Sequence, residues 1–401
     1  MASPDARARA SLGAYSGAGV KGLAQVLWDS GCGEPIAASI AIAGDFLPAG
    51  ALARPTGGWR EAAHALAPHF SDVDFAIVNL ECALDAEGLT PRPLAGLGTI
   101  VSAPSAALDY LTEVRARAIG LANNHTYDFG SVGVEHTLRA LTAQNLVPLG
   151  AGSTLCNALG TFVWHGPANI RVGFWAAATA SRDLATRTRE GVEPATLVRA
   201  SQAHKALQAA GANFSIAILH SGCIRTNRPD PTDARLMDEI AKCGFGIVAA
   251  SHSHRISGAK SFALRPSSPS LCFYGLGSIV SGYVASPLER EGLIIVAGFH
   301  ADGRLARVEV RPVLIGENGF GEVPSWETGQ EILHRFDRLS NEIADGSARR
   351  LFYQDLSRGI AQLYIRDLSA AFRASGLRGL IGKVGRLRMR HVRRVVHGLM
   401  G

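Results

Sequence analysis

Short apolar runs alternate with amphipathic segments along most of this chain, which predicts alternating strands and helices. Ten runs have the length and apolar content of buried strands: residues 39–43, 75–80, 118–121, 147–149, 171–177, 215–219, 246–250, 271–274, 293–299 and 305–312. Five segments between them repeat apolar residues with a helical period: residues 59–70, 105–114, 132–144, 199–210 and 233–243.

This alternation predicts an α/β fold with a mostly parallel core sheet covered on both faces. The last two predicted strands have no helix between them. They should therefore pair antiparallel at the end of the sheet or form a second sheet packed on the first. A four-layer α/β/β/α sandwich satisfies both patterns.

The pattern divides the chain into three regions. Residues 1–35 are rich in Gly, Ala and Ser and predict a loosely ordered lead-in with one short helix near residues 23–28. Residues 36–315 hold the strand and helix alternation, and residues 316–401 predict a helical C-terminal extension.

The extension ends in a basic amphipathic tail. Residues 372–401 hold eight Lys or Arg and no acid, with apolar residues near one helical face. Such a tail could contact an anionic membrane surface or dock a partner. The alternative is a packing helix with a solvated basic face, because four glycines weaken any isolated helix here.

Composition narrows the class of protein. A hydrophobic content of 47% with 18% charged residues is typical of a globular chain, and a net charge of +6 favours anionic ligands. The six cysteines lack Cys-x-x-Cys spacing and mostly lie in or beside apolar runs, which predicts reduced core residues. We see no secretory-signal pattern and no apolar run of about 18 residues, so we expect a cytoplasmic protein, at most peripheral to the membrane.

The sequence lacks the motifs that are typical of several classes of protein. We find no phosphate loop of the Gly-x-x-x-x-Gly-Lys-Ser/Thr type and no Gly-x-Ser-x-Gly elbow. Residues 17–22 match Gly-x-Gly-x-x-Gly, but no buried strand precedes them, so a dinucleotide site is weakly supported. Phe372 is the one aromatic residue in the basic tail, so we expect no nucleic-acid partner.

Polar side chains follow five of the predicted strands, at the point where each strand ends. They are Asp45, Glu81, the group Asn124, His125 and Asp128, then His220, and finally the pair His252 and His254. A parallel sheet brings such residues to a common edge. Singly, each has an ordinary explanation, such as a helix N-cap or a core histidine. Together they form a ligand set for divalent metal ions that is hard to explain as packing.

The order of these motifs resembles a known family. The residues that carry the resemblance are Gly44-Asp45, Asn79-Leu80-Glu81, the run from Asn123 to Gly130, Gly150-Ala-Gly152, His220-Ser-Gly222, His252-Ser-His254 and Tyr274-Gly-Leu-Gly277. They resemble the CapA family of capsule synthesis and poly-γ-glutamate biosynthesis proteins, within the calcineurin-like metallophosphoesterase superfamily. The resemblance spans about residues 38–312.

The resemblance implies roles for the metal-type residues. Asp45 and His254 would bind a first ion, Glu81 would bridge two ions, and the second ion would be held by Asn124, His220 and His252. His125 would be the catalytic or phosphate-contacting imidazole, oriented by Asp128. One or two divalent ions per chain, manganese, iron or zinc, are implied. Such a positive site suits phosphate or carboxylate substrates.

The chain departs from the family pattern at several positions. Leu47 stands where the superfamily has a metal-binding His, which puts the first site in doubt. Ser221 and the pair Ile224 and Arg225 replace a Trp and a Glu-Tyr pair of the family. These changes favour a divergent substrate over a lost site.

Three residues are predicted to contact the substrate: Asn123 in the central motif, and Arg225 and Arg255 directly after the histidine motifs. Arginine forks bind carboxylate or phosphate oxygens in pairs. For the two arginines, a solvated surface position is the alternative.

Two classes of function follow. The first is a metal-dependent hydrolase acting on a phosphoester or a γ-glutamyl-like substrate, with His125 stabilising charge or protonating the leaving group. The second is a non-catalytic accessory or scaffold component of an anionic-polymer biosynthesis complex. Expected partners are an anionic small molecule or polymer and other polymer-biosynthesis proteins.

Overall fold

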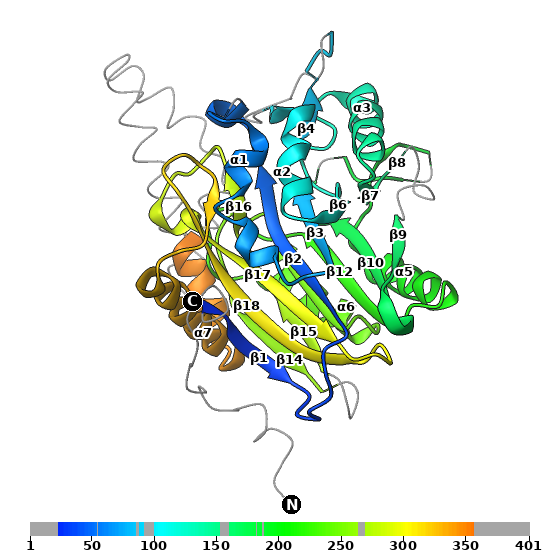
Figure 1. Ribbon diagram of the computed structural model, residues 1–401, viewed down its shortest axis with the longest axis vertical. Helices are drawn as coiled ribbons and strands as arrows, with labels where there is room; N and C mark the ends of the chain where they lie inside the picture. Colours follow the sequence, from blue (N-terminus) through cyan, green and yellow to red (C-terminus); the bar gives the residue numbers. More distant parts are fainter. Residues whose placement is uncertain are drawn as a thin grey trace, which may run out of the picture.

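Two β-sheets stack face to face, and helices cover the outer face of each, in the computed structural model (Figure 1). The structure describes residues 23–53, 55–85, 88–91, 100–152, 160–181, 183–186, 188–263 and 269–356. The predicted α/β/β/α sandwich is confirmed. The lead-in up to residue 22 and the basic tail lie outside the described residues.

The first sheet combines the early and the late strands of the chain. Its order is β1 (Gln25–Asp29), β18 (Leu305–Ile315), β17 (Glu291–Phe299), β2 (Ala38–Leu47), β3 (Phe75–Leu80), β6 (Ala116–Gly120) and β7 (Val147–Leu149), with β16 (Ser278–Ser281) beside β2 and β19 (Gly321–Glu322) beside β18. Strands β2, β3, β6 and β7 are parallel, whereas β17 pairs antiparallel with both β2 and β18. The late strands thus extend the first sheet, the first of the two arrangements predicted for them.

The middle of the chain forms the second sheet. Its order is β14 (Ala259–Phe262), β15 (Ser270–Phe273), β13 (Ile247–Ser251), β12 (Phe214–His220), β10 (Arg171–Ala178) and β9 (Thr161–His165). The four central strands are parallel and the two edge strands antiparallel. Two small two-stranded sheets pair β11 (Gly191–Val192) with β8 (Ala151–Gly152) and β4 (Ala83–Asp85) with β5 (Ser102–Pro104).

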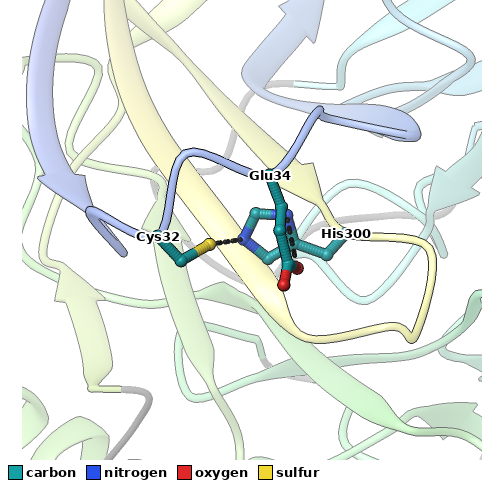
Figure 2. Close-up of side chains that lie close together, drawn as sticks. All are labelled: Cys32, Glu34 and His300. Carbon is teal, nitrogen blue, oxygen red and sulfur yellow. Dashed lines mark hydrogen bonds and ion pairs between the residues drawn. The ribbon is translucent and has the colours of Figure 1, made fainter.

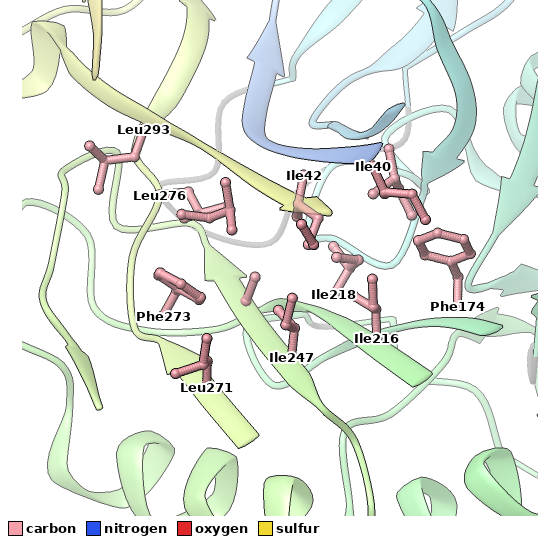
Figure 3. Close-up of a cluster of buried hydrophobic side chains, with 14 of the residues drawn as sticks. Ile40, Ile42, Phe174, Ile216, Ile218, Ile247, Leu271, Phe273, Leu276 and Leu293 are labelled. Atoms are coloured by element: carbon pink, nitrogen blue, oxygen red, sulfur yellow. The ribbon is translucent and has the colours of Figure 1, made fainter. Parts of the chain in front are cut away.

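Alternate residues of the strands serve two different cores. On β2, Ile40 and Ile42 face the second sheet, where they join a cluster that includes Phe174 and Ile216 (Figure 3). The intervening alanines of β2 belong to the outer cluster under the helices. That outer face is covered by α1 (Trp59–Ala63), α2 (Leu108–Glu113) and α3 (Gly130–Ala143). The outer face of the second sheet is covered by α5 (Leu197–Ala209) and α6 (Pro231–Lys242).

The helix predicted near residues 23–28 is wrong, because this segment forms β1, an edge strand paired antiparallel with β18. Pairing with a neighbouring strand outweighs local preference for such a short segment. The predicted helix at 59–70 is also interrupted. Pro68 stands at the start of a separate 3-10 turn, Ala67–Phe70, where its missing N–H costs no helical hydrogen bond.

The cysteine prediction is correct only in part. Cys82 and Cys272 are buried, Cys223 and Cys243 are half-buried, and Cys32 is exposed; all five are free thiols. The expectation of a core residue is therefore wrong for Cys32, which lies in the loop between β1 and β2 and not within an apolar strand. Cys156 lies outside the described residues.

Helix α7 (Trp326–Ala344) packs against β14 and β18 and closes one side of the sandwich. Its buried face supplies Ile332, Leu333, Phe336 and Leu339 to the core between the sheets. Phe336 stacks on Phe273 of the second sheet, with 6.5 Å between ring centroids. The helix lies within the region predicted as a C-terminal extension, and its apolar face is part of the main core. The boundary at residue 315 stays a prediction.

Replacing Phe336 with Ala should lower the free energy of unfolding by about 3–5 kcal/mol, because it leaves a cavity in the core between the sheets. Urea unfolding followed by circular dichroism measures this. Trp326→Ala is the matched control, since Trp326 belongs to the same helix but is 51% exposed. Equal effects of the two changes would mean that α7 is not part of the core.

Candidate metal centre

The predicted metal-type residues come together at the carboxyl ends of strands from both sheets. Asp45 lies near the end of β2, Glu81 directly follows β3, and Asn124 follows β6. From the second sheet, His220 is the last residue of β12, and His252 and His254 follow β13. We call these six residues the strand-end centre.

The ligand atoms of the strand-end centre form two groups that share Glu81. In the first group, Nδ1 of His254 lies 3.6 Å from a carboxylate oxygen of Asp45 and 3.6 Å from one of Glu81. In the second, Oε1 of Glu81 lies 3.4 Å from Nε2 of His220 and 3.8 Å from Nδ1 of His252. Within each group all three ligand atoms lie within 4.8 Å of one another. A carboxylate common to two groups is in the position of a bridging ligand.

Two amides complete this centre. The Oδ1 atom of Asn124 lies 2.6 Å from Nε2 of His220, so it is beside the second group. Asn79 was not predicted as a site residue, yet its Nδ2 donates a 2.7 Å hydrogen bond to Asp45 and lies 3.3 Å from Nδ1 of His220. Its spacing of two residues from Glu81 places it on the same side of an extended chain, which is the signal that could have identified it.

The buried polar atoms of the centre test whether a cation fits. The Oε2 atom of Glu81 and Nδ1 of His252 are buried and have no hydrogen-bond partner in the described part of the chain. Leaving such atoms unpaired costs stability, and a cation in each group would give Oε2 of Glu81 and Nδ1 of His252 a partner. Carboxylate oxygen and imidazole nitrogen together suit manganese, iron and zinc. The residues present therefore fit a divalent ion.

The backbone at the histidine pair is unusual. The backbone angle φ is 112° at His252 and 55° at His254, values that residues other than glycine rarely adopt. The backbone N–H of His252 donates a 3.0 Å hydrogen bond to Oδ2 of Asp45, which helps hold this conformation. Strain of this kind collects at functional sites, where it places side chains that a regular strand would direct elsewhere.

Leu47 explains why the first group has three ligand residues. Its side chain is buried in the hydrophobic cluster under the outer helices of the first sheet. The position where the superfamily pattern expects a histidine thus contributes packing, and no side-chain ligand atom.

The ionisable groups of the centre are buried close together, so they shift one another's pKa values. Burial and the charge of Glu81 raise the pKa of Asp45 to about 6. Burial alone would also raise the pKa of Glu81, but His254 and His220 outweigh it and hold this pKa well below its ordinary value. Burial and the neighbouring His252 lower the pKa of His220. At neutral pH these shifts favour ionised carboxylates at Asp45 and Glu81 and a neutral imidazole at His220, the forms that bind metal ions.

Metal affinity should fall as the pH drops below about 6, because Asp45 takes up a proton there and a protonated carboxyl is a poor ligand. Titration calorimetry with Mn²⁺ between pH 5 and pH 7.5 measures this. Asp45→Asn should bind more weakly at pH 7.5 and lose this part of the pH dependence. An affinity that stays constant across the range would contradict the assignment.

His125 and Asp128 form a hydrogen-bonded pair next to the centre. Nδ1 of His125 lies 2.8 Å from Oδ2 of Asp128, and the same oxygen accepts a 2.7 Å hydrogen bond from the backbone N–H of Val101. Burial opposes it, but the hydrogen bond to Asp128 and the charges of Glu81 and Asp45 raise the pKa of His125. The imidazole is thus oriented and favoured in its protonated form.

Asn123 holds the turn that carries this pair. It is 1% exposed; its Nδ2 donates to the carbonyl of Leu80 at 2.8 Å, and its Oδ1 accepts from the backbone N–H of His125 at 3.0 Å. These contacts bind the strand exits of β3 and β6 together. These contacts give Asn123 a positioning role, and its predicted contact with the substrate stays a prediction.

The two predicted substrate arginines meet at one buried carboxylate. Nε of Arg225 and an Nη atom of Arg255 lie 3.4 and 3.5 Å from Oε1 of Glu289. Arg255 also donates to Ser286, whereas the side chain of Arg225 is 47% exposed. The backbone N–H of Arg225 donates to the carbonyl of Ser253, between the two ligand histidines. Arg225 therefore lies beside the centre with its guanidinium partly open to a ligand.

The fold and these ligand groups define a class: a four-layer α/β sandwich with a candidate metal site at its strand ends. The family model described as bacterial capsule synthesis protein PGA_cap matches residues 39–283, and the chain belongs to this family. The predicted family resemblance is confirmed.

The chain shares low sequence identity with one curated relative and with several solved structures. The chain is 24% identical over 221 residues to the capsule biosynthesis protein CapA of Bacillus anthracis, a match that covers 54% of this chain and 52% of that protein. The chain thus spans about half the length of this curated relative. Similar solved structures include the calcineurin-like phosphoesterase YfkN from Bacillus subtilis, with 13% identity, a TM-score of 0.42 and coverage of 77% of this chain and 98% of that one. Another is a 5'-nucleotidase precursor from Thermus thermophilus, with 13% identity, a TM-score of 0.43 and coverage of 75% of this chain and 58% of that one.

Proposed function

We propose that this protein is a metal-dependent hydrolase of capsule or poly-γ-glutamate-type polymer biosynthesis, acting on a phosphoester or γ-glutamyl-like substrate. The observation that carries the proposal is the pair of ligand groups sharing Glu81, with the His125 and Asp128 pair beside them. This is a complete set of groups for binding cations and moving a proton at one place.

In this proposal, Asp45, Glu81 and His254 hold one ion, and Glu81, His220, His252 and Asn124 hold the other. A bound divalent ion would polarise the bond to be cut and make water a better nucleophile. The protein supplies the orientation: Asn79 fixes the carboxylate of Asp45, and the backbone of His252 fixes its second oxygen.

His125 is the proposed proton donor. Its Nδ1 lies against Asp128, so the proton available to a substrate is that on Nε2 of the imidazolium form. The raised pKa favours this protonated form. An imidazolium can protonate a leaving group or stabilise developing negative charge.

The proposed substrate is an anion, small or polymeric. Arg225 supplies a partly exposed guanidinium beside the centre, whose geometry suits carboxylate or phosphate oxygens. Among the described residues, no helix has the length and apolar character of a bilayer span. We keep a cytoplasmic location, with peripheral membrane contact through the basic tail, as part of the proposal.

A second candidate function is that of a non-catalytic accessory component that holds an anionic chain for other polymer-biosynthesis proteins. The observation that favours it is the packed side chain of Leu47, which leaves the first group with one ligand fewer than the superfamily pattern. A single ion at the second group could bind an anionic polymer without cleaving it.

Turnover distinguishes the two functions. Protein loaded with Mn²⁺ would be assayed against bis-p-nitrophenyl phosphate, p-nitrophenyl phosphate and poly-γ-glutamate, with Asn124→Ala/His220→Ala as the inactive comparison. Hydrolysis that disappears in the variant supports the enzyme. Metal-dependent binding of poly-γ-glutamate without hydrolysis of any of the three would support the accessory function.

A further inference from the structure

A second cluster of metal-type side chains lies at the opposite edge of the first sheet (Figure 2). Cys32 and Glu34 belong to the connection between β1 and β2, and His300 directly follows β17. They lie at the amino end of β2, whereas Asp45 is near its carboxyl end. At about 3.3 Å per residue, the strand separates Ala38 from Asp45 by roughly 23 Å, so the two clusters are distinct.

The donor atoms of this cluster converge. The Sγ atom of Cys32 lies 3.2 Å from Nε2 of His300. Oε2 of Glu34 lies 3.8 Å from Nδ1, the other nitrogen of the ring, so Glu34 has to turn toward Nε2 to join an ion there. The three ligand atoms lie within 4.8 Å of one another. The hydroxyl of Ser30 is a fourth neighbour, 3.1 Å from Nε2 of His300 and 3.3 Å from Sγ of Cys32.

The histidine of the cluster is fixed in a manner common to metal ligands. His300 is only 3% exposed, and its Nδ1 lies 3.4 Å from the backbone carbonyl of Pro35. Metal-ligating histidines usually direct one ring N–H to a carbonyl or carboxylate, which leaves the lone pair of the other nitrogen for the ion. Here that other nitrogen is Nε2, the one facing Cys32 and Ser30. Cys32 and Glu34 are exposed, so an ion can reach the cluster from solvent.

We propose that Cys32, Glu34 and His300 form a second metal site for a thiophilic divalent ion of the zinc class, separate from the strand-end centre. The two sites should differ in the ions they prefer, because the sulfur of Cys32 favours softer ions whereas the strand-end centre offers only oxygen and nitrogen ligands. Binding replaces the thiol proton, which is released to solvent. The bound ion would link the connection that precedes β2 to the turn that follows β17.

The distances accommodate such an ion with a small shift. Zinc bonds of about 2.3 Å to sulfur and 2.0 Å to nitrogen, arranged tetrahedrally, place the two donors roughly 3.6 Å apart. The observed 3.2 Å requires Cys32 to move by a few tenths of an ångström, which an exposed connection between strands permits. Arg304 lies 3.2 Å from Oε2 of Glu34, so the carboxylate is held near the site by a neighbouring cation. Ser30 or water completes the coordination.

Cobalt(II) is the probe, because a thiolate bound to it gives a charge-transfer band in the near ultraviolet that oxygen and nitrogen ligands do not give. The full-length protein, freed of metal, would be titrated with Co²⁺. We expect the band in the unaltered protein and in His220→Ala/His252→Ala, whose strand-end centre is damaged. Cys32→Ser should abolish it, and Glu34→Gln should weaken Co²⁺ affinity by more than about tenfold.

Cys243→Ser is the matched control, because Cys243 is a free, half-buried cysteine at the end of α6 and should leave the band unchanged. A band that survives Cys32→Ser, or the lack of any band in the unaltered protein, would overturn the proposal. As a second readout, Zn²⁺ should protect Cys32 from alkylation by iodoacetamide, as mapped by mass spectrometry, while labelling of Cys243 stays the same. Equal labelling of Cys32 in Zn²⁺ and in chelator would also overturn it.

Discussion

Glu81→Gln is expected to remove metal from both ligand groups of the strand-end centre at once. Glu81 is the residue common to both groups, and an amide is a poor substitute for a buried, ionised carboxylate between imidazoles. His254→Gln removes a ligand from the first group alone, so it should cost about one ion and leave the second group filled. If the protein is a hydrolase, losing the bound metal should lower kcat/KM by on the order of 10²–10⁴-fold.

Metal analysis by plasma mass spectrometry after gel filtration measures this result, and a thermal melt shows whether each variant is folded. Glu135→Gln is the matched control, because Glu135 is exposed on α3, away from both ligand groups. It should keep the metal content of the unaltered protein. A Glu81→Gln protein that is folded and retains all its metal would remove the basis for the shared-ligand centre.

His125→Gln is expected to slow turnover by about 10²–10⁴-fold while the metal content stays unchanged. The imidazole of His125 belongs to neither ligand group, so its loss should separate proton transfer from metal binding. His136→Gln is the control, since His136 lies on α3 and is within hydrogen-bond distance of Ser105. A His125 variant that loses metal in step with activity would make this histidine a ligand and not a proton donor.

The pH profile adds a test that a purely structural role would not meet. The hydrogen bond that His125 donates to Asp128 helps raise the pKa of His125 above its ordinary value, and the active form in our proposal is the protonated one. Activity should therefore fall as the pH rises through this pKa. Asp128→Asn removes the carboxylate, so the pKa should drop and the falling limb should move to lower pH. If the falling limb of the pH profile stays at the same pH in Asp128→Asn, it reports the titration of a group other than His125.

Much of the fold was predictable because apolar runs alternate regularly with amphipathic segments along the chain. The central parallel strands β3 and β12 are buried along their whole length and mostly apolar, so each was located from the sequence. That β3 and β12 belong to two different sheets could not be predicted, because buried parallel strands of either sheet have similar sequences. Edge strands were the least visible: β1 and β9 are short and only partly buried, and their neighbours supply the pairing that makes them strands.

The strand-end centre was predictable for a related reason. Polar residues at the ends of apolar runs stand out. The carboxyl ends of the parallel strands of both sheets meet at one side of the sandwich, where Asp45 of the first sheet lies 3.8 Å from His220 of the second. Asn79 was hidden because it lies within a strand. The contact of Cys32 with His300 joins residues far apart in the sequence. It depends on the antiparallel pairing of β17 with β2, which no local pattern identifies.

The position of β17 beside β2 has a consequence for how the protein is made. A chain that has left the ribosome only as far as His254 already contains every residue of the strand-end centre. It still lacks β17, the strand that must hydrogen-bond along one edge of β2 from Ala38 to Ala43. Closing that edge joins segments about 250 residues apart, the kind of distant pairing that makes folding slow. The sheet around the strand-end centre can therefore be completed only once translation has passed Phe299.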